Sequence, residues 1–145
     1  MMPMSFPDKE LEGSAHDAFA FLFSEWNAQI VQSRFDRQVF SNGFVVIRAG
    51  NAVIRIVRDR GVLSVEVGPE RADAWDWFDL ERVVQILRGM TIGWPISDGS
   101  LTDLGRILRE NISEIMSAFS DERFPATKAR LKTALEKAHR PPTAT

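Results

Sequence analysis

The amino-acid sequence predicts an α+β fold, in which an antiparallel β-meander of three to four strands packs against an N-terminal helix and about three C-terminal helices. Apolar residues first recur at steps of three and four, as on one face of an amphipathic helix. Between about Phe35 and Val67 the pattern changes to β-branched runs that turn residues interrupt. Helical spacing returns from Asp79 onward.

The first expected element is a helix within residues 8–31 that begins near Ser14. Acidic residues crowd its N-terminal side, where they complement the positive end of the helix dipole. Its buried stripe is predicted from five apolar residues: Ala15, Phe19, Leu22, Trp26 and Ile30. Residues 32–37 are then expected to form a polar break before the sheet.

The meander is expected to open at Val39-Phe40 and to continue in three clearer strands, at residues 44–48, 52–58 and 62–67. Turn residues separate these runs, and the expected turns are Asn42-Gly43, Gly50-Asn51 and Asp59-Arg60-Gly61. In the last strand apolar and polar residues alternate, which predicts one buried face.

Arg58 is the unusual residue of the meander. Alternation places it on the apolar face of its strand with Ile54 and Ile56, whereas Arg55 lies on the opposite face. An arginine on an apolar face needs a partner, because an unpaired buried charge is costly. The expected partners of these arginines are Asp59, Glu66 or the acids that follow the meander, and the alternative is an anion site.

After Gly68-Pro69 an irregular acidic and aromatic connection is expected, and Asp79 then has the features of an N-cap for a helix that Gly89 closes. Residues 90–99 have the composition of a long interior loop. Two more amphipathic helices are predicted, one from about Leu101 to Phe119 and one that includes Leu131.

Composition indicates a single domain of residues 1–145, ordered over about 8–140, with a disordered tail at 141–145. The apolar fraction of 44% and the charged fraction of 26% are typical of globular proteins. A net charge of −2 disfavours nucleic-acid binding, because a phosphate backbone attracts an excess of positive charge. A nucleic-acid module would rest on the basic C-terminal helix alone, with Lys128, Arg130, Lys132 and Lys137.

The chain has no cysteine, which excludes disulfides, thiolate chemistry and cysteine-containing zinc sites. Residues 1–8 lack a basic region followed by an apolar run, and no stretch approaches the ~20 apolar residues of a membrane-spanning helix. The expected location is therefore the cytoplasm, with no membrane partner.

The sequence shows no recognisable catalytic constellation, cofactor motif or metal site. Its two histidines, His16 and His139, lie near opposite ends of the chain. No glycine-rich phosphate loop or nucleophile elbow is present. Carboxylates do gather at Asp73, Asp76, Asp79 and Glu81, so a carboxylate-dependent hydrolase that uses Asp73, Asp76 or Asp79 is one hypothesis.

The same segment supplies the candidate protein-binding residues Asp73, Trp75, Asp76 and Trp77. Aromatic anchors rimmed by negative charge are typical of a surface that binds a basic protein. The plainer interpretation is that Asp79 and Glu81 serve the start of a helix while the other acids solvate a loop. At least one aromatic residue of this segment is expected in the core.

Three stretches carry a resemblance: Phe40-Ser41-Asn42-Gly43-Phe44-Val45-Val46, Arg55-Ile56-Val57-Arg58-Asp59-Arg60-Gly61 and Trp77-Phe78-Asp79-Leu80. They resemble the core of short bacterial α+β proteins, some of which are similar to immunity proteins of polymorphic toxin systems. The resemblance implies a cytoplasmic domain that binds and blocks a toxin, often a basic nuclease, through carboxylates and aromatics of residues 70–81. It carries no catalytic residue. A secretion-chaperone-like homodimer that holds an unfolded client is the alternative.

Overall fold

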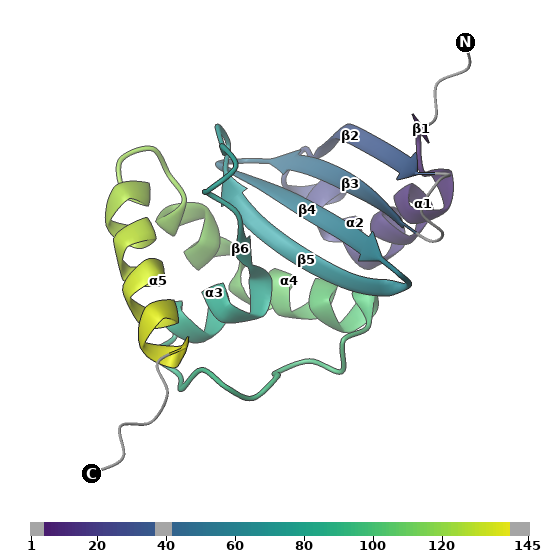
Figure 1. Cartoon of the computed structure of the whole chain (residues 1–145). Coiled ribbons are helices and arrows are strands. Elements are labelled where there is room, and N and C mark those ends of the chain that lie inside the picture. Colours follow the sequence, from purple (N-terminus) through teal and green to yellow (C-terminus); the bar gives the residue numbers. More distant parts are fainter. Residues whose placement is uncertain (1–4, 37–41, 140–145) are drawn as a thin grey trace.

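The computed structural model describes residues 5–36 and 42–139 (Figure 1). Within them the chain forms an antiparallel sheet of six strands in sequential order, together with five helices. The elements are β1 (Ser5–Phe6), α1 (Lys9–Ala18), α2 (Ala20–Glu25), β2 (Gln29–Asp36), β3 (Asn42–Ala49), β4 (Ala52–Asp59), β5 (Val62–Pro69), β6 (Phe78–Asp79), α3 (Leu80–Leu87), α4 (Leu101–Ala118) and α5 (Phe124–His139). The predicted α+β class is confirmed, as are three helices after the sheet.

The sheet has more strands than the predicted three to four. Gln29–Asp36 is strand β2, so the expected polar break at residues 32–37 is wrong. β2 escaped prediction because only one of its faces is covered, and exposed residues such as Gln32 and Arg34 alternate with half-buried ones. The two-residue strands β1 and β6 complete the edges, and neither is long enough to leave a pattern.

The N-terminal helical region consists of two helices rather than one. It begins at Lys9 instead of near Ser14, because the Asp8 side chain caps the helix by accepting a hydrogen bond from the Leu11 N–H (3.0 Å). The helix breaks at Phe19, and Asn27, with a φ of 51°, then turns the chain into β2. The predicted stripe residue Ile30 therefore belongs to the sheet.

Two of the three predicted turns of the meander are confirmed. Gly50 (φ 56°) lies in one, and Arg60 (φ 53°) with Gly61 (φ 81°) forms the other. Asn42-Gly43, in contrast, is not a turn, because these residues begin β3 and pair with Asp36 and Phe35 of β2. The predicted opening strand at Val39-Phe40 lies outside the described residues.

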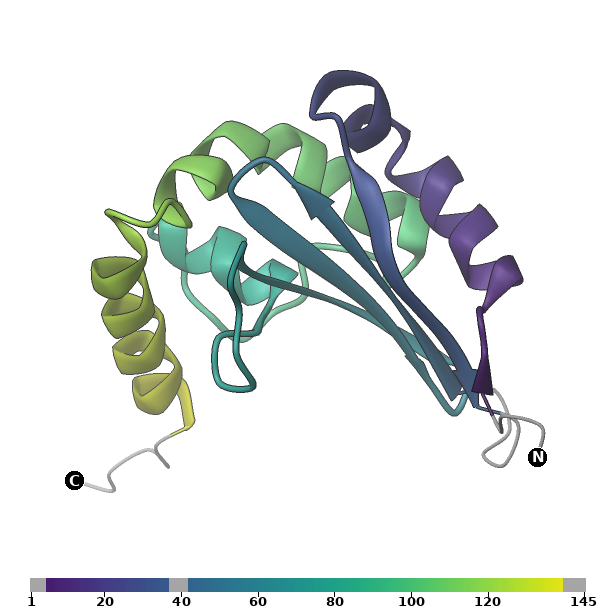
Figure 2. The same cartoon turned by 90° about the horizontal axis from the view of Figure 1, so that it is seen from above.

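Side chains of one sheet face and of the helices form the hydrophobic core. Figure 2 shows α1, α2 and α4 on the same side of the sheet. Alternate residues of β3, β4 and β5 point to this side and are fully or almost fully buried: Val45, Ile47, Ile54, Ile56, Val65 and Val67. Helices α1 and α4 cross closely at Gly105, where an added Cβ would lie 2.1 Å from the Ala18 carbonyl oxygen.

The predicted helix cap and the predicted loop in the second half of the chain are confirmed, whereas the predicted tail at 141–145 lies outside the described residues. Asp79 caps α3 by accepting a hydrogen bond from the Arg82 N–H (3.2 Å). The loop at residues 90–99 crosses to α4 without regular secondary structure. Two side chains of α3 hold it: Gln85 Nε2 donates to the Trp94 carbonyl (2.7 Å), and Glu81 Oε1 accepts from the Ile96 N–H (3.0 Å). No helix among the described residues is long and apolar enough to cross a membrane.

Candidate protein-binding surface

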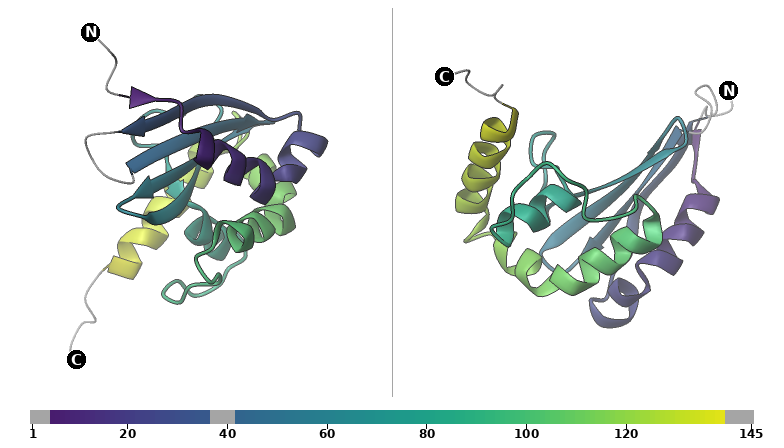
Figure 3. Two further views of the ribbon diagram at one scale, coloured as in Figure 1. Left: turned by 90° about the vertical axis from the view of Figure 1, so that its right-hand side faces the viewer. Right: turned by 90° about the horizontal axis from the view of Figure 1, so that it is seen from below.

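One face of the sheet is left open by the helices, as two views of the ribbon show (Figures 2 and 3). Its outward side chains follow from the strand register, with Phe44 opposite Val57 and with Val46 opposite Arg55. An apolar strip therefore crosses β3 and β4. Phe44 and Val57 are partly exposed, whereas Val46 is only 6% exposed.

Residues 70–77, the β5–β6 segment, project from the sheet on this open side (Figure 2). Asp76 holds the segment in place. It is 7% exposed, and its carboxylate accepts hydrogen bonds from Lys128 Nζ of α5 (2.6 Å) and from the Asp73 N–H (3.3 Å). The hydrogen bond from Lys128 lowers the pKa of Asp76, and the same bond raises the pKa of Lys128. The segment is thus tied to α5.

Asp73 orders the tip of the β5–β6 segment. Its Oδ1 accepts a hydrogen bond from the Trp75 N–H (2.9 Å), which is the local turn that aspartate favours. Trp75 itself packs against little and is 79% exposed. The large aromatic side chain is therefore presented to solvent by a backbone that two aspartates hold.

Trp77 closes the base of the segment against the sheet. The Arg55 guanidinium lies over its ring, 4.3 Å from the centroid. Arg55 Nε and Nη2 each lie 2.9 Å from Oε1 of Glu66 on the neighbouring strand, as the predicted cross-strand pairing required. Gly68 lets the segment lie this close to β5, because an added Cβ would lie 3.0 Å from the Asp76 carbonyl oxygen and 3.4 Å from the Trp77 ring.

Between the open face and the β5–β6 segment lies a cavity of about 520 Å³, the sheet hollow. Phe44, Val46 and Val57 form its apolar part, and residues 72–74 and Trp77 line its side. Its charged groups are one arginine and two carboxylates: Arg55, Glu66 and Asp73. Arg55 and Glu66 neutralise one another as an ion pair. The remaining charge among the residues that line the hollow is therefore the negative charge of Asp73.

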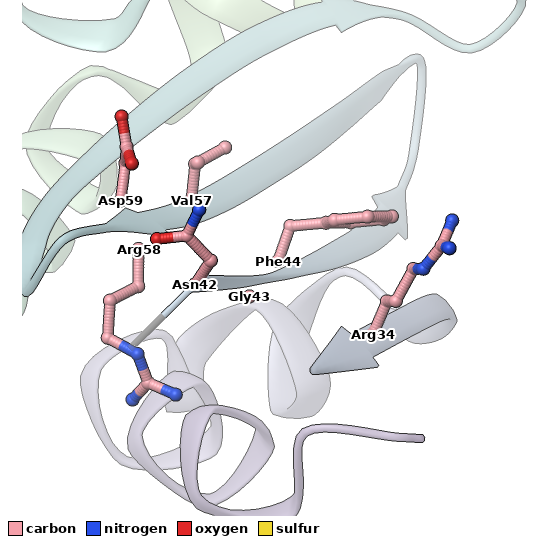
Figure 4. Close-up of a pocket in the computed structure, with 7 residues that line it drawn as sticks. All are labelled: Arg34, Asn42, Gly43, Phe44, Val57, Arg58 and Asp59. Atoms are coloured by element: carbon pink, nitrogen blue, oxygen red, sulfur yellow. The ribbon is translucent and has the colours of Figure 1, made fainter. Parts of the chain in front are cut away.

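A second hollow, of about 480 Å³, lies at the other end of these strands and contains Arg34 and Arg58 (Figure 4). Their guanidinium groups point away from one another, so they do not converge on one anion. Arg58 instead reaches Asp8, with Nη2 2.7 Å from Oδ2. The predicted need for a partner is confirmed, but the main partner is Asp8, the cap of α1, with the exposed Glu10 farther away at 3.9 Å from Nη1. Neither is among the acids expected from the sequence.

The arrangement of the acids gives the hydrolase hypothesis no support. Asp76 binds Lys128 and Asp79 caps α3, so of the three acids proposed for hydrolysis Asp73 alone lines the sheet hollow. Among the described residues no group of three or more metal-ligating side chains could hold a metal ion.

The basic C-terminal helix also binds its own chain. Besides the Lys128 contact, Arg130 Nη2 donates a hydrogen bond to the Ile86 carbonyl (2.6 Å). Two of the four basic residues that favoured a nucleic-acid module therefore connect α5 to the rest of the fold.

The four predicted binding residues lie together in one segment, but they play different parts. Trp75 is a surface residue, Asp73 borders the sheet hollow, and Trp77 is half-buried. Asp76 is not the solvated loop acid of the plainer interpretation, since it is buried against Lys128. Phe78 supplies the expected core aromatic, at 7% exposure.

The sequence reasoning missed the open face itself. Phe44, Val46 and Val57 were assigned to strands, and strand alternation alone would have placed them together on the face opposite the core.

Comparison of the chain with protein-family models, curated proteins and solved structures finds no significant match.

Proposed function

We propose that this chain is a small cytoplasmic protein-binding module, in its most specific form an immunity-protein-like binder of a toxin. The observation that carries the proposal is Trp75, which is 79% exposed at the tip of the β5–β6 segment. Tryptophan is the residue type most enriched among binding hot spots, because it buries a large area in a partner's pocket. A segment already held by hydrogen bonds loses little conformational entropy on binding.

The neighbouring features complete a binding surface of ordinary anatomy. Trp75 is the anchor, the sheet hollow offers apolar area beside it, and Asp73 gives the rim negative charge. This charge suits a basic partner, as the resemblance to immunity proteins implies, and would raise the rate of association. Asp76 supports the surface from beneath through Lys128.

The test is co-expression of the tagged chain with the product of the gene adjacent to its own, followed by purification and a cell-survival assay. Wild-type protein is expected to retain the neighbouring protein and protect the cells. Trp75→Ala should bind about 10- to 30-fold more weakly, the loss typical of a hot-spot residue. Trp94→Ala is the matched control, because Trp94 is 82% exposed but lies in the connection between α3 and α4.

Equal binding by the two tryptophan variants would remove Trp75 from the interface. Absence of both retention and protection in wild-type protein would overturn the immunity form of the proposal. A dimer in light scattering that holds unfolded clients regardless of Trp75 would favour the secretion-chaperone-like alternative.

A further inference from the structure

We propose that the sheet hollow receives a basic side chain of the partner, with the aliphatic stem of a lysine or arginine over its apolar part and the cationic head beside Asp73. The inference rests on the proposed function and adds the chemistry of the partner residue. Two features of the sheet hollow support it: the kind of surface that it offers and the sign of its uncompensated charge.

The surface suits a long aliphatic stem. Phe44 and Val57 are partly exposed in the hollow, and both come from the middle strands of a sheet whose register holds them opposite one another. Lysine and arginine bury their methylene groups along such surfaces while the charged head stays at the polar edge. A cavity of about 520 Å³ has ample room for one side chain of this size.

The charge of the hollow selects the sign of the head. Arg55, its one cation, is neutralised by Glu66 and covered on one side by the Trp77 ring. Both guanidinium contacts go to Oε1 of Glu66, and no other described residue donates a hydrogen bond to Oε2. Asp73 uses Oδ1 to hold the Trp75 N–H and forms no ion pair with a described residue. Lys128 interacts electrostatically with Asp73 but is bound to Asp76, so these three groups together keep one negative charge. A cationic head would therefore meet acceptors, whereas a carboxylate would be repelled.

Small fragments can test this without the natural partner. Butylguanidinium reproduces the stem and head of arginine, and butylurea has nearly the same shape without the charge. Each is titrated at constant ionic strength into ¹⁵N-labelled protein, and the amide signals of Phe44, Val46 and Val57 and the indole N–H of Trp77 are followed. Butylguanidinium is expected to shift these signals and to bind at least about fivefold more tightly than butylurea.

Variants locate the charge that matters. Asp73→Asn keeps an oxygen to accept from the Trp75 N–H, so the turn is preserved while the charge is lost, and butylguanidinium should bind about threefold more weakly. Glu70→Gln is the matched control, since Glu70 is an exposed acid of the same segment that does not line the hollow. It should leave the affinity unchanged.

Equal binding of the two fragments, shifts confined to other parts of the protein, or an Asp73→Asn variant with wild-type affinity would each overturn the inference. Trp75→Ala separates the two proposals, because Trp75 does not line the hollow. If Trp75→Ala loses partner binding but the fragments do not bind the hollow, the basic side chain is refuted and the proposed surface stands. If the fragments bind the hollow but no partner binds in a way that depends on Trp75, only the proposed surface is refuted.

Discussion

Replacing Asp8 by alanine removes two interactions that meet at one carboxylate. Oδ1 caps α1 at the Leu11 N–H (3.0 Å), and Oδ2 binds Arg58 Nη2 (2.7 Å). Loss of a cap costs about 1 kcal/mol. Breaking a fully buried ion pair costs about 3 to 5 kcal/mol, and we take the lower end because the Arg58 side chain is 16% exposed while that of Asp8 is 3% exposed. The free energy of unfolding of Asp8→Ala should therefore fall by about 4 kcal/mol.

A series of variants separates the free energy of the helix cap from that of the ion pair. Asp8→Ser keeps a capping oxygen and should lose about 3 kcal/mol, as should Arg58→Met, which strands the carboxylate. Arg58 Nε is buried and has no hydrogen-bond partner among the described residues, so the ion pair carries a desolvation cost of its own. The double variant Asp8→Ser/Arg58→Met removes both charges and should lie within about 2 kcal/mol of wild type.

The assay is urea unfolding followed by circular dichroism at 222 nm, with the slope of the transition compared between variants to check two-state behaviour. A loss of about 4 kcal/mol corresponds to a fall in Tm of roughly 13 °C for a chain of this size. A cost of less than about 1.5 kcal/mol for Asp8→Ala would contradict a buried ion pair at this position, as would a double variant that is as unstable as the sum of the single ones.

Four further outcomes follow from the same structure. Gly105→Ala should destabilise the protein by about 1 to 3 kcal/mol or more in the same urea assay, because the added Cβ would lie 2.1 Å from a backbone oxygen. Gly13→Ala should instead stabilise α1 by about 0.5 to 1 kcal/mol, because its added Cβ would have no atom within 4 Å. Gly50→Ala should cost about 1 to 2 kcal/mol in thermal unfolding, since φ is 56° and the added Cβ would lie 2.9 Å from a sulfur. The Asp76–Lys128 pair should hold the β5–β6 segment throughout neutral pH. The lowered pKa of Asp76 makes its contribution fully present above about 3.9 and lost as the pH falls through the lower folded value. The raised pKa of Lys128 makes its contribution fully present below about 10.5 and lost as the pH rises through the higher folded value. NMR signals of the segment should therefore shift only at these extremes, and a change near pH 7 would contradict the assignment.

Local patterns predicted much of this fold. Alternation located β3, β4 and β5 and placed Arg58 on the core face, because side-chain direction in a strand depends only on its period of two. Asp79 was recognised as a helix cap, since that hydrogen bond closes within three residues. β2 was missed because only one face of this strand is covered, so its sequence lacks a continuous apolar run.

For the candidate site, the order of the amino acids shows which segment carries aromatics and acids, but not what each of them does. Tertiary packing decided that Trp75 is exposed, that Asp76 is buried and that Phe44 borders a hollow. It also chose the partners, since Arg58 and Asp8 lie 50 residues apart in the chain and Asp76 and Lys128 lie 52 apart. The physical reason is the range of the forces involved: backbone periodicity is read from neighbouring residues, whereas an ion pair depends on which distant elements the hydrophobic core brings together.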